Sequence, residues 1–110
     1  LLAQIFRGSL EALKHRGRAK VGDKTMVDAF EPAVDALEKS AGAGLSLAEG
    51  LKQAAGGAQR GVENTKECVA KFGRAKSYGE KSIGLQDAGA TSVWIIFQAM
   101  SDWLSREENR

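Results

Sequence analysis

Apolar residues in this chain recur every three to four positions, and no stretch alternates apolar with polar residues in the manner of a β-strand. The helical period runs through residues 1–15, 25–38, 47–72 and 90–105. Such spacing gathers the apolar side chains on one face of each helix, and a neighbouring helix must cover that face. The pattern therefore predicts an all-α fold, an antiparallel helical bundle.

Capping and breaking residues mark where the predicted helices start or bend. Ser46 and Glu49 have the spacing of a capping box at the start of the third helix. Thr25 or Asp23 is suited to cap the second helix. Pro32 lies inside that second helix and removes a backbone donor, so we expect a kink just before it.

The third helix combines many alanines with glycines at positions 50, 56, 57 and 61. Each glycine costs up to about 1 kcal/mol relative to alanine in a helix. Small residues in such number let a neighbouring helix approach closely. A phosphate-binding role for Gly56 and Gly57 is disfavoured, because no strand precedes them and no Lys-Ser/Thr pair follows.

Charge and cysteine content limit the classes of function. Sixteen Lys and Arg against fourteen Asp and Glu leave a formal net charge of +2, and the basic residues are spread along the 110 residues. This distribution argues against a nucleic-acid binder, which concentrates its basic residues on one face. The single cysteine, Cys68, excludes an intrachain disulfide and is typical of a cytoplasmic protein. The apolar run at residues 93–97 is far shorter than the ~20 residues of a membrane-spanning helix.

The sequence contains no recognisable metal-ligand cluster or nucleophilic pair. One His and one Cys cannot build a zinc site. Asp23, Asp28 and Asp35 could be imagined around one metal ion, but their spacing suits exposed helix positions better. We expect His15 to be a helix-end residue near the last carbonyls. No catalytic or metal-ligating residue is therefore assigned.

Two glycine-bearing polar loops are the candidate ligand sites. They span residues 16–24 and 73–89, and each joins basic side chains to the start of a helix. Glycine backbone can approach a ligand closely, and helix N-termini favour anions. These physical arguments leave a phosphate site and ordinary connecting loops as equal alternatives.

The loop sequences resemble the nucleotide-binding L subunit or domain of the dihydroxyacetone kinases. Residues 22–29, Gly-Asp-Lys-Thr-Met-Val-Asp-Ala, carry the first part of the likeness together with their approach at residues 15–17. Residues 73–75, 79–84 and 87–90 carry the second part. The alanine-rich helix between the two blocks has the expected length, so the likeness covers nearly the whole chain.

The resemblance implies part of an eight-helix up-and-down barrel, with ATP or ADP bound at one end by the interhelix loops. The family transfers a phosphoryl group to dihydroxyacetone, which is held covalently on a separate K domain or subunit. Matching positions imply that the nucleotide is contacted by Gly17, Met26, Arg74, Asp87, Ala88 and Gly89.

Each of these positions has a physical role under the resemblance. The glycines permit close backbone approach, and Met26 offers a soft apolar surface to adenine. Arg74 can pair with phosphate or ribose oxygens through its planar fork. Asp87 either accepts a hydrogen bond from a ribose hydroxyl or caps the final helix, with equal weight on the two alternatives.

This chain departs from the family pattern at three places in the second loop. Residues 76–78 read Lys-Ser-Tyr where Ser-Tyr-Leu is usual, Leu85 stands where His is common, and Ala88 replaces Pro. These departures put the local register of the loop in question. Ala88 lacks the fixed φ of proline but keeps its backbone amide as a donor.

In the family, aspartates near the start of the domain bind two Mg²⁺ ions, and this part would precede Leu1. We therefore expect residues 1–110 to be the C-terminal portion of a single L-type domain, not a competent kinase alone. An incomplete barrel would expose apolar surface and self-associate, as a homodimer or a swapped assembly. The alternatives are a non-catalytic helical interaction or scaffold module and the nucleotide domain of a fatty-acid-kinase-like enzyme.

Overall fold

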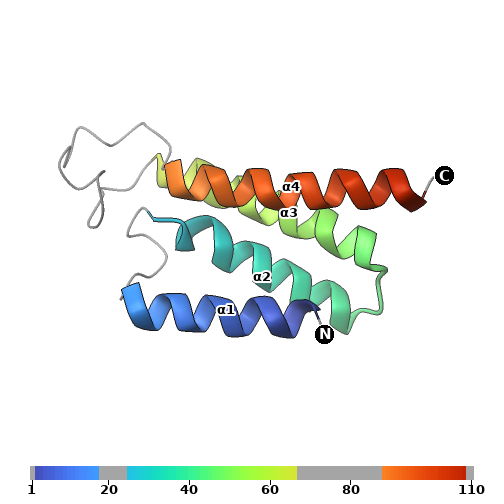
Figure 1. Cartoon of the computed structure of the whole chain (residues 1–110), viewed down its shortest axis with the longest axis horizontal. Coiled ribbons are helices and arrows are strands. Elements are labelled where there is room, and N and C mark those ends of the chain that lie inside the picture. Colours follow the sequence, from blue (N-terminus) through green and yellow to red (C-terminus); the bar gives the residue numbers. More distant parts are fainter. Residues whose placement is uncertain (1, 18–24, 67–87, 109–110) are drawn as a thin grey trace.

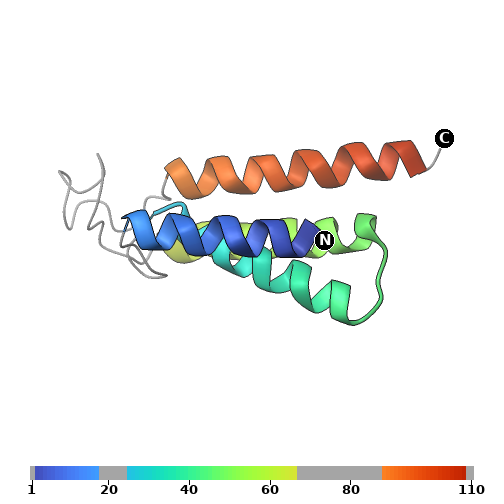
Figure 2. The ribbon, with the colours of Figure 1, turned by 60° about the horizontal axis from the view of Figure 1, so that its bottom comes forward.

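The computed structural model describes residues 2–17, 25–66 and 88–108, and this part of the chain contains four helices and no strand (Figure 1). The helices are α1 (Leu2–Gly17), α2 (Val27–Gly42), α3 (Leu47–Thr65) and α4 (Ala88–Glu108). Successive helices run in opposite directions along the long axis of the molecule (Figures 1 and 2). The prediction of an all-α antiparallel bundle is confirmed.

The helix boundaries differ from the predicted ones by two to four residues. α1 continues to Gly17 instead of residue 15, α2 ends at Gly42 instead of residue 38, and α4 begins at Ala88 instead of residue 90. Residues 16–17, predicted to begin the first loop, therefore belong to α1, and residues 88–89, predicted to end the second loop, belong to α4. The predicted extension of α3 to residue 72 and the position of Cys68 lie outside the described residues.

The turn between α2 and α3 contains a left-handed glycine just after the C-cap Ala43 and then the predicted N-cap of α3. The Leu45 amide donates to the Ser40 carbonyl at 3.0 Å, and Gly44 has a φ of 75°, which favours glycine. This geometry carries α2 past its predicted end, because the left-handed residue comes only after Gly42. Ser46 Oγ then accepts from the Glu49 amide at 3.2 Å, so the Ser46 half of the predicted capping box is confirmed, whereas the Glu49 carboxylate accepts from Gln53 Nε2.

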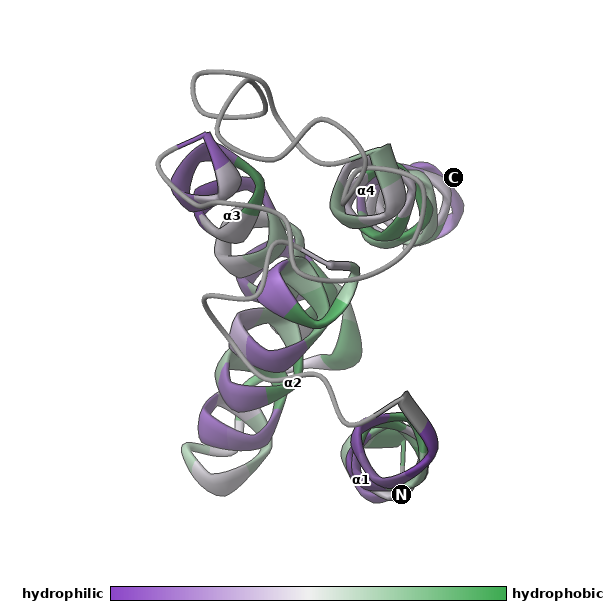
Figure 3. Ribbon diagram, turned by 90° about the vertical axis from the view of Figure 1, so that its left-hand side faces the viewer, coloured by the Kyte–Doolittle hydropathy of each residue, from purple (hydrophilic) through white to green (hydrophobic). Residues whose placement is uncertain are grey.

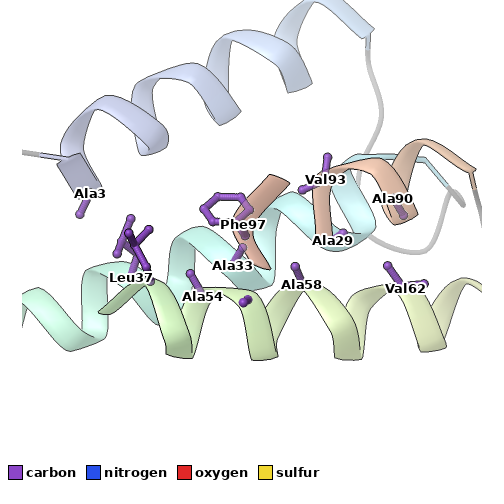
Figure 4. Packing of buried hydrophobic residues seen from close by; sticks show 12 residues of the cluster. Ala3, Ala29, Ala33, Leu37, Ala54, Ala58, Val62, Ala90, Val93 and Phe97 are labelled. Carbon is purple, nitrogen blue, oxygen red and sulfur yellow. The ribbon is translucent and has the colours of Figure 1, made fainter. Parts of the chain in front are cut away.

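The closest helix contact joins α2 and α3 at the predicted small residues. A Cβ placed on Gly61 would lie 2.0 Å from the Asp28 carbonyl oxygen, and one on Gly57 would lie 2.7 Å from the Pro32 carbonyl oxygen. Fully buried alanines of the two helices fill the contact between them (Figure 4), namely Ala29, Ala33, Ala54 and Ala58. At Gly57 and Gly61 the backbones therefore approach each other without an intervening side chain, as the glycine content predicted.

Pro32 lies on the face of α2 that meets α3. A proline has no N–H to donate to the carbonyl one turn earlier, which is that of Asp28. Gly61 of α3 packs against this same carbonyl oxygen. α2 continues through Pro32 as one helix, and a bend before it stays a prediction.

Three phenylalanines link α1, α2 and α4. The ring centroids of Phe6 and Phe97 lie 5.2 Å apart, and Phe30 lies 6.2 Å from Phe6 and 6.1 Å from Phe97. α1 packs on α2, and α4 packs on α3 and α2, whereas the backbones of α1 and α4 do not meet (Figure 3). The Phe6–Phe97 contact therefore bridges two helices that are not neighbours.

Arg7 ties α1 to two carboxylates of α2. Its Nη2 lies 2.5 Å from Asp35 Oδ1, and its Nε donates to Glu38 Oε1 at 3.1 Å. The hydrogen bond from Arg7 lowers the pKa of Glu38, and the two carboxylates together raise the pKa of Arg7. Because ion pairs exposed to water contribute little to stability, this cluster serves mainly to align α1 on α2.

Large apolar side chains are exposed on α1 and α4. Ile5 is 54% exposed, Ile95 59%, Ile96 57% and Trp103 56%. This confirms the predicted exposed apolar surface, and surfaces of this kind commonly meet a partner. Within the described ranges, no helix has the length and apolar character needed to cross a membrane.

Candidate functional site

Four helix ends lie at one end of the bundle (Figure 1). The C-terminal ends of α1 and α3 and the N-terminal ends of α2 and α4 form this end, which Figure 3 shows from the front. We call it the loop end and define it by Gly17, Met26, Lys66 and Ala88. The predicted site residues Gly17, Met26, Ala88 and Gly89 all belong to it. Arg74 and Asp87 lie outside the described residues.

A closed set of hydrogen bonds starts α2 at the loop end. Met26 already has helical angles, φ −56° and ψ −25°, so the capping residue is Thr25. Thr25 Oγ1 accepts from the Val27 amide at 3.2 Å, and the Thr25 amide donates to Asp28 Oδ2 at 2.8 Å. This is a variant of the capping box, with Asp in the place of Glu and with the hydroxyl bonded to the second helical amide instead of the third. Of the two predicted caps, Thr25 is confirmed, and Asp23 lies outside the described residues.

Asp28 is buried, at 2% exposure, although its sequence position predicted an exposed residue. That prediction was wrong for two physical reasons. The carboxylate turns back to the Thr25 amide, and the Asp28 carbonyl lies against Gly61 of α3. Asp35 is exposed as predicted. Over residues 2–17, 25–66 and 88–108, no group of three or more His, Cys, Asp or Glu side chains could hold a metal ion.

Met26 combines a fixed backbone with an accessible side chain. Its carbonyl accepts from the Phe30 amide at 2.9 Å, and the next residue, Val27, is buried at 1% exposure in a cluster with α1. Met26 itself remains 36% exposed at the loop end. The thioether can therefore present a polarisable apolar surface to a flat ligand group.

Ala88 and Gly89 form the first turn of α4 and are exposed, whereas the sequence predicted them in a loop. The next residue, Ala90, is fully buried and anchors this turn in the core. The first amides of a helix point away from it, and its N-terminus carries a partial positive charge. The start of α4 therefore gives the loop end a position that favours an anionic group, whereas at the start of α2 the Thr25, Val27 and Asp28 amides are donated within the cap.

The last turn of α1 adds a cation that the sequence did not single out. Lys14 Nζ donates to Glu31 Oε1 of α2 at 2.7 Å, and this hydrogen bond to the carboxylate raises the pKa of Lys14. The two residues are 17 positions apart, so local spacing carried no signal of this pair. His15 lies in the same last turn of α1, as predicted.

Comparison with known proteins places the chain in a family. An L-erythrulose kinase of Pectobacterium atrosepticum is 43% identical over 96% of this chain and 18% of its own length. The ADP-binding subunit DhaL of the PEP-dependent dihydroxyacetone kinase of Escherichia coli is 40% identical over 91% of this chain and 48% of its own length. A DhaL subunit of Listeria innocua is 36% identical over 90% of this chain and 44% of its own length.

The chain thus spans just under half the length of these two DhaL subunits and under a fifth of the erythrulose kinase. Residues 1–102 match the DAK2 domain. This match includes the helices as well as the two loops whose sequences resemble the family. The chain therefore belongs to the DAK2 domain family.

Proposed function

We propose that this chain is the nucleotide-binding portion of a dihydroxyacetone kinase and that ATP or ADP binds at the loop end. The observation that carries the proposal is the shared position of Gly17, Met26, Ala88 and Gly89, which lie at the ends of three separate helices. Relatives named as ADP-binding subunits of dihydroxyacetone kinases support it. In the intact protein, the acceptor is dihydroxyacetone or a related small ketose held on a K domain or subunit.

The groups at the loop end suit the parts of a nucleotide. The start of α4 favours the phosphates, and the exposed Met26 thioether suits adenine. Arg74 pairs with phosphate or ribose oxygens, and Asp87 either accepts from a ribose hydroxyl or caps α4. Phosphoryl transfer also needs Mg²⁺ to neutralise the developing charge. The described residues offer no group of ligands that fits this ion, so we assign it no ligand among them.

Replacing Arg74 by alanine is expected to weaken ADP binding about 10- to 100-fold, because a hydrogen bond to a charged group contributes about 1.5–3 kcal/mol. Titration calorimetry of Mg·ADP into the whole protein measures this change. Arg106→Ala is the matched control, since Arg106 lies in the last turn of α4, at the opposite end of the bundle.

Two outcomes would count against the proposal in different ways. A whole protein that binds no ADP would refute the nucleotide site and favour a scaffold module. Equal affinities for Arg74→Ala and Arg106→Ala would remove Arg74 from the site. A fatty-acid-kinase-like enzyme would bind ADP in the same way and would be told apart by its phosphoryl acceptor.

We also propose that the exposed apolar side chains of α1 and α4 are covered by a second copy, in a homodimer or swapped assembly. Their exposure at Ile5, Ile95, Ile96 and Trp103 supports this. Sedimentation of the chain should show a concentration-dependent dimer, and Trp103→Glu should shift it to monomer. A wild-type chain that stays monomeric at high concentration would contradict the assembly.

The single Cys68 supports a cytoplasmic location.

A further inference from the structure

The starts of α2 and α3 use the same kind of cap in different surroundings. At α3, Ser46 Oγ accepts from the Glu49 amide, while the Glu49 carboxylate accepts from Gln53 Nε2 at 3.1 Å. Ser46 is exposed, and α3 starts at the end of the bundle opposite the loop end (Figure 1). A helix in this protein can therefore start well without a buried carboxylate.

At α2 the carboxylate is buried and closes the box. Asp28 Oδ2 lies 2.8 Å from the Thr25 amide, and the Asp28 amide donates to the Thr25 carbonyl at 3.0 Å. The Asp28 carbonyl is held from the other side by the close approach of Gly61. Burying a carboxylate is costly unless it is hydrogen-bonded. The exposed cap of α3 shows that a helix start does not need such a buried carboxylate.

The residues held by this box flank Met26. Thr25 precedes it and is bound through its amide, its carbonyl and its hydroxyl. Val27 follows it and is buried. The side chain of Met26 is thus left exposed on a backbone that is fixed on both sides, and the backbone of Asp28 and Ala29 packs closely against Gly61 of α3.

We propose that Asp28 is a positioning residue for the nucleotide site. It does not contact the nucleotide. Its buried carboxylate holds Thr25, and Thr25 in turn sets the place of Met26 at the loop end. The inference rests on the proposed function, because it assumes that the loop end binds a nucleotide.

The test compares Asp28→Ala with Ser46→Ala in the whole protein. Both variants weaken a helix start, so the urea midpoint of unfolding should fall in both. Only Asp28→Ala should weaken Mg·ADP binding, by about tenfold. Asp28→Asn keeps an acceptor oxygen for the Thr25 amide and should recover most of the affinity.

A spectroscopic signal separates positioning from general loss of stability. The methyl resonance of Met26, identified by Met26→Leu, should shift when ADP saturates the wild type and Ser46→Ala. In Asp28→Ala the chemical shift of this methyl group should already differ from the wild-type value before ADP is added, because the Met26 backbone is no longer held. If Asp28→Ala does not fold, Thr25→Ala replaces it in the same comparison, since it removes the hydroxyl that binds the Val27 amide.

The possible results are distinct. Equal ADP affinities and equal methyl shifts in Asp28→Ala and Ser46→Ala would overturn the positioning role while leaving the nucleotide site in place. Absence of ADP binding by the wild-type whole protein would instead show that the proposed function has failed.

Discussion

Replacing Gly61 by alanine is expected to destabilise the protein by about 3 kcal/mol or more, the upper part of the range for overpacked sites. The new Cβ would lie 2.0 Å from the Asp28 carbonyl oxygen and 2.8 Å from Ala29 Cα, and both atoms belong to the backbone of α2. Backbone cannot rotate away as a side chain can, so α2 and α3 would have to move apart. Urea denaturation followed by circular dichroism measures the loss.

Gly56→Ala is the matched control in the same helix. A Cβ there would meet only Arg60 Nη1, at 3.6 Å, which is an ordinary contact. The substitution should therefore stabilise the protein by up to about 1 kcal/mol, because alanine favours helix more than glycine does. Stabilisation at both positions would show that helix propensity, and not the α2–α3 contact, controls the outcome.

These two glycines also show what the sequence could and could not predict about the fold. The apolar period predicted four helices, and the glycine content predicted a close contact. Gly57 and Gly61 are four residues apart and so share a face, whereas Gly56 is turned away by about 100°. Which face meets α2 depends on tertiary packing, so the sequence did not separate the glycines in contact from the one that is not.

The candidate site was predictable to the extent that it depends on topology. In an antiparallel bundle, the end of the first helix and the starts of the second and fourth lie at the same end. The apolar period predicted this antiparallel arrangement, and the arrangement alone implies that Gly17, Met26 and Ala88 lie at one end. The joint action of these residues on a nucleotide stays a proposal.

The burial of Asp28 could have been predicted only in part. Thr25 and Asp28 have capping-box spacing, three residues apart, and that signal was present in the sequence. The contact with Gly61 joins residues 33 positions apart and depends on how α2 crosses α3. The Lys14–Glu31 pair was out of reach for the same reason, since it joins two helices across a loop.

Replacing Phe97 by alanine is expected to cost about 3–5 kcal/mol, the usual range for a buried phenylalanine. Phe97 is 2% exposed and contacts both Phe6 and Phe30. Because the backbones of α1 and α4 do not meet, loss of this ring removes a bridge between them. Hydrogen exchange of the α1 amides should therefore accelerate more than that of α3, which keeps its contacts with α2.

Trp103→Ala is the matched control, since it removes another aromatic ring from the same helix at a position that is 56% exposed. Measured where the protein is monomeric, its cost should stay within about 0.5 kcal/mol, as for most surface substitutions. A double-mutant cycle with Phe6→Ala should give a coupling of about 0.5–1.5 kcal/mol to Phe97→Ala, the range for aromatic pairs. If the two losses simply add, the Phe6–Phe97 contact does not hold α1 in place, and the docking of α1 must depend on α2 and the Arg7 cluster alone.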